Sequence, residues 1–196
     1  MKAKEFLTKL GVAATLSVVS LLGGVSVCSA YNPNSVPSYC QRSSPWAGDT
    51  LGYGPGTLGI WGCFVTCIGD ETQFFNGGNW DPRTMNNWLK ARGDFSGNLV
   101  IPSRAPGYLG WNNYSRSAAD LNHINGLLDA GYLVIAETRW PTNRSLTHYV
   151  LLTGHSGTTY SISDPWYGDR VTFQSRYGDP GRWIYSIYIF GRTYSI

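Results

Sequence analysis

Lysine is almost absent beyond residue 30, where only Lys90 remains, and charged residues make up just 14% of the 196-residue chain. Without the three lysines and single glutamate of the first 30 residues, 12 basic and 11 acidic side chains are left, a net charge of +1. A chain so close to neutral has no broad basic field that could hold a phosphate backbone. The composition therefore predicts that nucleic acid is not a partner.

Other absences narrow the function further. Past residue 30 no apolar run reaches the length of a membrane span. There is no glycine-rich phosphate loop followed by Lys and Ser or Thr, and no set of Cys and His at the spacing of a zinc site. We therefore expect neither a metal nor another cofactor, and no stable membrane insertion of the mature chain.

The first 30 residues have the pattern of a secretory signal peptide. Three lysines precede the apolar stretch Leu10–Val27, and Cys28-Ser29-Ala30 places small residues before a cut. We expect cleavage after Ala30, which leaves residues 31–196 as one secreted domain, extracellular or periplasmic. Two alternatives are an uncleaved membrane anchor and a lipid-modified Cys28.

Helical patterns dominate the first half of the mature chain and strand patterns the second. Helices are predicted over Cys63–Phe75, from Asp81-Pro82 to about Gly93, and over Ser117–Ala130. Apolar runs predict five strands, over residues 132–136, 149–153, 159–163, 171–173 and 184–190. This order predicts an α+β fold, with a helical amino-terminal half packed on an antiparallel sheet.

Three cysteines remain beyond residue 30: Cys40, Cys63 and Cys67. An odd number in an oxidising compartment leaves at least one thiol without a partner inside the chain. Cys63 follows Gly62 and opens a predicted helix, whose first N–H groups favour a thiolate. We therefore predict Cys63 as a nucleophile and a Cys40–Cys67 disulfide that ties the amino-terminal segment to the helix. The alternative Cys40–Cys63 bridge would abolish this chemistry.

His148 is the best candidate for the base among the three histidines. It begins an apolar strand, where the rim of a sheet would hold the imidazole rigidly, whereas His123 lies in a predicted helix and His155 in a turn. A neutral imidazole can take the thiol proton, and the resulting imidazolium pairs with the thiolate.

Asp164 is the candidate that orients this base. It follows the next strand, 16 positions after His148, a spacing that suits two strands of one hairpin with their ends side by side. A carboxylate there would fix the tautomer and orientation of the imidazole, with Pro165 and Trp166 as cover. Gln41, in the preceding extended segment, is a candidate oxyanion donor together with a backbone N–H.

Three segments in this order resemble the bacteriocin-processing, double-glycine leader peptidases, in particular their stand-alone relatives. The segments are Gly62–Thr66, Thr147–Gly154 and Tyr160–Trp166. The resemblance spans about residues 40–190 and implies a papain-like fold, with the Cys, His and Asp roles argued above.

The chain departs from that family at two positions. Gln41 precedes Cys63 by 22 positions, whereas the glutamine of the transporter-linked members lies a few residues before the cysteine, where this chain has Thr57. Cys67 replaces a position that is often small and polar in the family.

These residues together predict a secreted cysteine peptidase or amidase. The Cys63 thiolate would attack a peptide or isopeptide carbonyl, and His148 would protonate the leaving amine and then activate water. The partner would be a peptide or protein substrate, cell-wall peptide included. Two alternatives share the scaffold: a transglutaminase-like acyltransferase, and a catalytically silent papain-like module that binds wall glycan or peptide through exposed aromatic side chains.

Overall fold

The fold is described from a computed structural model that covers residues 31–104 and 114–190. The predicted signal peptide, residues 1–30, lies outside these ranges. Within them, no helix has both the length and the apolar character needed to cross a bilayer. The elements in chain order are η1 (Pro33–Ser35), α1 (Leu58–Trp61), α2 (Cys63–Asn76), α3 (Pro82–Ala91), β1 (Phe95–Ser96), β2 (Leu99–Val100), β3 (Tyr114–Ala118), α5 (Leu121–Asp129), β4 (Val134–Trp140), β5 (Asn143–Ser156), β6 (Thr159–Asp164), β7 (Asp169–Thr172), α6 (Phe173–Tyr177), α7 (Pro180–Trp183) and β8 (Ser186–Phe190).

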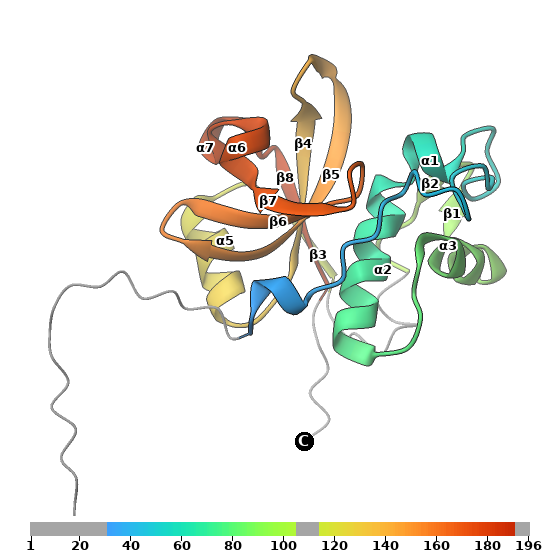
Figure 1. The fold of residues 1–196 in the computed structure, drawn as a ribbon, viewed down its shortest axis with the longest axis horizontal. Helices are drawn as coiled ribbons and strands as arrows, with labels where there is room; N and C mark the ends of the chain where they lie inside the picture. Colours follow the sequence, from blue (N-terminus) through green and yellow to red (C-terminus); the bar gives the residue numbers. More distant parts are fainter. Residues whose placement is uncertain (1–30, 105–113, 191–196) are drawn as a thin grey trace, which may run out of the picture.

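Six strands form one antiparallel sheet in the spatial order β3-β8-β4-β5-β6-β7. Strand β5 pairs with β4 on one side and with β6 on the other, and the short strands β1 and β2 pair separately. Figure 1 shows this sheet beside the helices α1, α2 and α3 of the amino-terminal half. The predicted α+β class, with helices packed on an antiparallel sheet, is confirmed.

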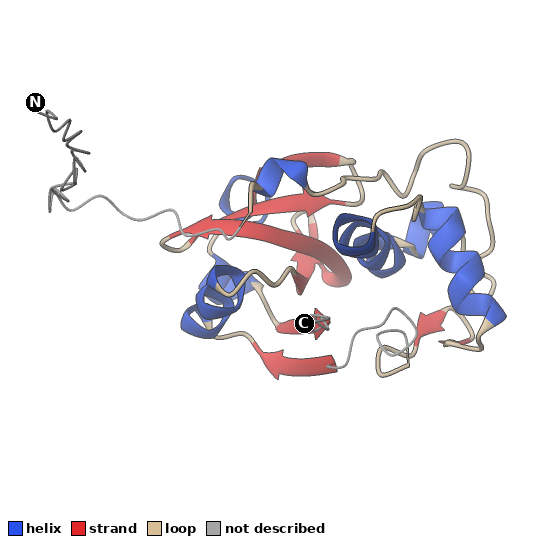
Figure 2. Cartoon of the chain, turned by 90° about the horizontal axis from the view of Figure 1, so that it is seen from below, coloured by secondary structure: helices blue, strands red, loops and turns tan. Residues whose placement is uncertain are grey.

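Both faces of the sheet are covered, because alternate residues of a strand point to opposite sides. On β5, Leu151 packs in a cluster with Ile68 of α2, whereas Val150 and Leu152 pack in a second cluster with Ile124 of α5. Figure 2 shows the strands between α5 on one side and the amino-terminal helices on the other. A strand buried on both faces needs apolar residues at successive positions, which explains the uninterrupted apolar run in β5.

The first turn of α2 is fixed to the sheet by an aromatic cluster. The Phe64 ring lies 4.9 Å from the ring of Tyr149 on β5 and 5.0 Å from that of Tyr188 on β8, both in edge-on geometry. Edge-to-face aromatic pairs add about 0.5–1.5 kcal/mol beyond the burial of their area. These contacts therefore hold the start of α2, where Cys63 lies, against β5 and β8.

The amino-terminal segment of residues 31–50 runs from the sheet to the helices and is drawn in blue in Figure 1. The Ser38 hydroxyl donates to the first carbonyl of β7 (3.1 Å), and the Gln41 N–H donates to a carbonyl in the turn after β6 (2.7 Å). Farther along, Asp49 forms an ion pair with Arg83 of α3 at 2.6 Å. The segment thus links the sheet and the helices.

The predicted helix over Ser117–Ala130 was wrong at its start. Ser117 belongs to β3 and pairs with Ile187 of β8, and α5 begins only at Leu121. Asp120 explains the boundary, because its carboxylate accepts hydrogen bonds from the first free N–H groups of α5.

Candidate active site

His148 and Asp164 meet at the edge between β5 and β6. Nε2 of His148 lies 3.1 Å from Oδ1 of Asp164, and the two side chains are only 3% and 0% exposed. The prediction that His148 begins a strand was wrong, because β5 begins at Asn143. Asp164 ends the antiparallel neighbour β6, one residue past the last pair, Leu151 with Ser163. The structure therefore brings together the two residues that the 16-residue spacing had selected.

Asp164 is surrounded by hydrogen-bond donors. Besides His148, its carboxylate accepts from the Trp166 N–H (3.0 Å), from Nη1 of Arg176 (2.9 Å) and from the Tyr177 hydroxyl (2.7 Å). Burial alone would raise the pKa of this carboxyl. The hydrogen bond and charge of His148, followed by Tyr177 and Arg176, outweigh the burial and hold the pKa of Asp164 below its usual value. The carboxylate is thus ionised beside the imidazole.

Arg176 and Tyr177 were not found by sequence reasoning. Both lie on the five-residue helix α6, which is too short to show a periodic pattern. Arg176 also binds Asp169 through two nitrogens, at 2.7 and 2.8 Å, and its guanidinium lies 4.1 Å from the centre of the Tyr167 ring. The sequence could have indicated only that further donors exist, because a buried carboxylate needs more hydrogen bonds than a single imidazole supplies.

The His148 ring is packed between aromatic side chains. The Trp140 ring stands edge-on at 5.1 Å between centroids, and the Tyr177 ring lies nearly parallel at 6.1 Å. Burial by itself lowers the pKa of His148, but hydrogen bonds with Asp164 and Cys63 outweigh burial and raise the pKa to about 9. The imidazolium is therefore the favoured form near neutral pH.

Cys63 is the first residue of α2, where the helix presents its positive end. Cys63 is only 8% exposed, and its interaction with His148 helps to raise the pKa of that imidazole. Since Nε2 of His148 faces Asp164, Nδ1 is the nitrogen left for the sulfur. The His148 imidazole therefore interacts with both Cys63 and Asp164.

Gln41 lies fully buried against α1, the short helix that precedes Cys63. Its Nε2 donates to the carbonyls of Gly59 (3.2 Å) and Leu58 (3.4 Å). Its Oε1 is buried without a hydrogen-bond partner among the described residues. The side-chain amide is thus held beside the start of α2 and would have to turn one hydrogen towards the substrate to act as an oxyanion donor.

The predicted disulfide between Cys40 and Cys67 does not form. Both thiols and that of Cys63 are free. The Cys40 thiol donates a hydrogen bond to the Trp166 carbonyl (3.4 Å), and its Cβ packs against Gly168. Cys67, on α2, is fully buried. A disulfide requires the two sulfurs to meet, whereas the Cys40 thiol donates to the carbonyl of Trp166 instead. Burial, joined by nearby carboxylates, holds the pKa of Cys67 well above its usual value, so this thiol is unreactive.

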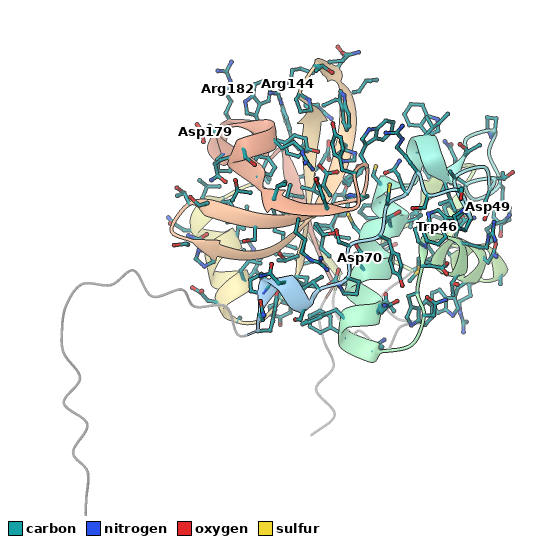
Figure 3. All side chains as sticks on the ribbon, in the orientation of Figure 1. Trp46, Asp49, Asp70, Arg144, Asp179 and Arg182 are labelled. Carbon is teal, nitrogen blue, oxygen red and sulfur yellow. The ribbon has the colours of Figure 1, made fainter. Side chains whose placement is uncertain are left out.

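Asp70 links α2 to the amino-terminal segment and to β6 through hydrogen bonds. It lies two turns after Cys63 on α2 and is labelled in Figure 3. Its buried carboxyl accepts from the Tyr39 N–H (3.0 Å) and from the Ser163 hydroxyl (3.0 Å), one residue before Asp164. Burial raises the pKa of Asp70 well above its usual value, so the group is favoured as the neutral acid.

Replacing Asp70 by alanine should lower the free energy of unfolding by about 1–3 kcal/mol, because the Tyr39 N–H loses its acceptor. Asp70→Asn should cost less than about 1 kcal/mol, since an amide can accept from the Tyr39 N–H and donate to Ser163. The Ser163 hydroxyl has a single proton, and in either variant it can give that proton to the Ser38 hydroxyl at 2.8 Å. Urea unfolding of both variants checks this expectation, which is wrong if the two are equally unstable.

Stability should also depend on pH through His148. Its folded pKa of about 9 lies above the unfolded value of 6.5, so its contribution is complete below pH 6.5 and is lost as the pH rises through 9. A difference of this size corresponds to a loss on the order of 3 kcal/mol. Urea unfolding at pH 6.5 and 9.5 measures the decline, and His148→Gln should make it shallower. An equal decline in both proteins would contradict the assigned ion pair.

Comparison with protein-family models gave no match to the chain, and comparison with curated proteins gave none either. Among solved structures, the chain is similar to a crystal structure from Bacillus anthracis described as that of a candidate C39-like peptidase. The two chains share 17% sequence identity at a TM-score of 0.49, over 81% of this chain and 96% of the other. A similarity of this size gives no information on activity, so the chemistry rests on the geometry of this chain.

Proposed function

We propose that this protein is a cysteine peptidase or amidase that cleaves a peptide or isopeptide bond through an acyl-enzyme. The observation that carries the proposal is that the His148 imidazole lies 3.1 Å from the Asp164 carboxylate and also interacts with Cys63. Nucleophile, base and orienting carboxylate within hydrogen-bond reach of one another are the arrangement of acyl-transfer enzymes.

In the first half of the reaction, the Cys63 sulfur, as thiolate, attacks the substrate carbonyl carbon. The carbon–nitrogen bond then breaks, and the His148 imidazolium gives its Nδ1 proton to the leaving amine. A thioester joins the acyl group to Cys63. In the second half, neutral His148 takes a proton from water, and the resulting hydroxide attacks the thioester. The acid leaves, and thiolate and imidazolium are restored.

The buried surroundings support these steps. Asp164 stays ionised, so it stabilises the imidazolium and keeps Nδ1 directed at the sulfur. Negative charge on the substrate oxygen would be met by the backbone N–H of Cys63 at the start of α2. Gln41 is the proposed second donor, because its amide is held beside the preceding helix.

The experiment is an incubation of residues 31–196 with an unbiased peptide mixture, with and without a primary amine in excess. Mass spectrometry of the products separates the two acyl acceptors. New peptide termini that carry a free carboxyl group in both reactions support hydrolysis. Amide products that displace the acid whenever the amine is present would show an acyltransferase instead. No new product in either reaction would contradict the proposed function.

A further inference from the structure

A cavity of about 570 Å³ opens beside the Cys63 sulfur, and we call it the Cys63 cavity. Its described lining comes from five separate parts of the chain: Leu51, the junction of α1 and α2, the hairpin β1–β2 with the residues after it, the start of β5, and Tyr188 of β8. Large apolar or aromatic side chains in this lining include Trp61, Leu99, Leu146, Tyr149 and Tyr188. Because Cys63 is one of the lining residues, a group that fills this cavity would lie close to the bond attacked in the proposed reaction.

The rim of the Cys63 cavity exposes large apolar side chains. Leu99 is 70% exposed, Trp61 53% and Leu146 45%, and each comes from a different wall. Single exposed apolar residues are common on protein surfaces, but several around one opening form a contiguous apolar patch, which is typical of a binding site. The rim therefore suits an apolar ligand.

The interior of the cavity has the same character. Apart from Cys63, which acts as a thiolate in the proposed reaction, the described residues that line it are uncharged, and they include the packed rings of Phe64, Tyr149 and Tyr188. A charged substrate side chain would lose its hydration there without gaining a partner. The volume falls in the range of roughly 300–1,000 Å³ that holds drug-sized ligands, so one or two large side chains fit.

We propose that the Cys63 cavity binds a large apolar side chain, aromatic or branched aliphatic, of a substrate residue next to the bond that Cys63 attacks. This inference rests on the proposed function and names its substrate class. A pair of glycines, the feature that names the family the sequence resembles, has no side chain and would leave the cavity empty.

The first test compares peptides that differ only around the cleaved bond. In one series phenylalanine or leucine occupies each flanking position in turn, and in the matched series glycine or aspartate does. We expect one position at which the large apolar residue raises kcat/KM at least about tenfold over glycine. Equal or faster cleavage of the double-glycine peptide would overturn the inference while leaving the proposed function intact.

Variants at the rim locate this preference in the cavity. Leu99→Asp and Leu146→Asp should reduce the phenylalanine-to-glycine ratio of kcat/KM towards one. The matched control is Ile60→Asp, because Ile60 is 60% exposed beside Trp61 yet does not line the cavity. Ile60→Asp should keep the wild-type ratio. If both rim variants keep the wild-type phenylalanine-to-glycine ratio of kcat/KM, the apolar side chain binds outside the Cys63 cavity and the inference is wrong.

A second readout does not depend on peptide cleavage. The rate of Cys63 alkylation by N-benzyl iodoacetamide is divided by the rate with iodoacetamide, and the ratio is normalised to that of free cysteine. A benzyl group that enters the cavity should raise the normalised ratio about tenfold, and Leu146→Asp, unlike Ile60→Asp, should remove the increase. A ratio near one in the wild type overturns the inference, whether or not any peptide is hydrolysed.

Discussion

Cys63→Ala should reduce peptide turnover by on the order of 10³-fold or more, because loss of the nucleophile removes the covalent route and leaves only binding and oxyanion stabilisation. The fold should persist, since the variant loses one sulfur atom at the edge of the sheet. Turnover is measured with any peptide that the wild-type protein cleaves, and circular dichroism verifies the fold. Mass spectrometry of the wild type during turnover should detect an acyl group on Cys63.

The other two thiols supply matched controls for this experiment. Cys67→Ala removes a fully buried thiol one turn farther along the same helix, and Cys40→Ala removes the thiol that faces the Trp166 carbonyl. Both variants should keep most of the activity, since neither sulfur is hydrogen-bonded to the imidazole. Loss of activity in Cys67→Ala with retention in Cys63→Ala would show that the nucleophile is misassigned.

Asp164→Asn should lower kcat by about 10²–10⁴-fold with little change in KM. If the amide oxygen faces His148, the NH₂ group faces the donors Arg176 and Tyr177. If the amide is turned round, its NH₂ group faces Nε2 and favours the tautomer with the proton on Nδ1. Neither orientation preserves the wild-type hydrogen bonds. The alkaline limit of kcat should also move to lower pH, because Asp164 contributes to the raised pKa of His148.

Asp169→Asn is the matched control for Asp164→Asn. Asp169 is the second carboxylate bound by Arg176, but it is partly exposed and does not contact the imidazole. The control should change kcat by no more than a few-fold and leave its pH profile in place. If both variants lose activity equally, the role of Asp164 is to anchor Arg176 and the orienting assignment fails.

Local chemistry made part of this structure predictable. Asp81 and Pro82 marked the start of α3, where the Asp81 carboxylate accepts from the Thr84 N–H. Gly62 marked the start of α2. The spacing of His148 and Asp164 was informative because a hairpin converts distance along the chain into register across two strands. Signals of this kind act over a few residues or through one turn.

The contacts that sequence reasoning missed are set by tertiary packing. Nothing near Arg176 indicates that α6 turns its guanidinium towards Asp164, 12 residues earlier. Cysteine counting selected a Cys40–Cys67 bridge, yet counting carries no information on the direction of a Cβ atom, and Cys40 faces Trp166 instead. The buried Asp70 had no sequence signal either, because its partners Tyr39 and Ser163 are 31 and 93 positions away.

The segment of residues 31–50 determines when the site is completed during synthesis of the chain. It is the first described part of the chain to be synthesised, but the carbonyls that accept from Ser38 and Gln41 lie more than 120 positions later. Contacts so distant along the chain close large loops and form late during folding. The surroundings of Cys63 are therefore completed only after β6 and β7 have emerged, so the proposed activity would begin only when nearly the whole polypeptide exists.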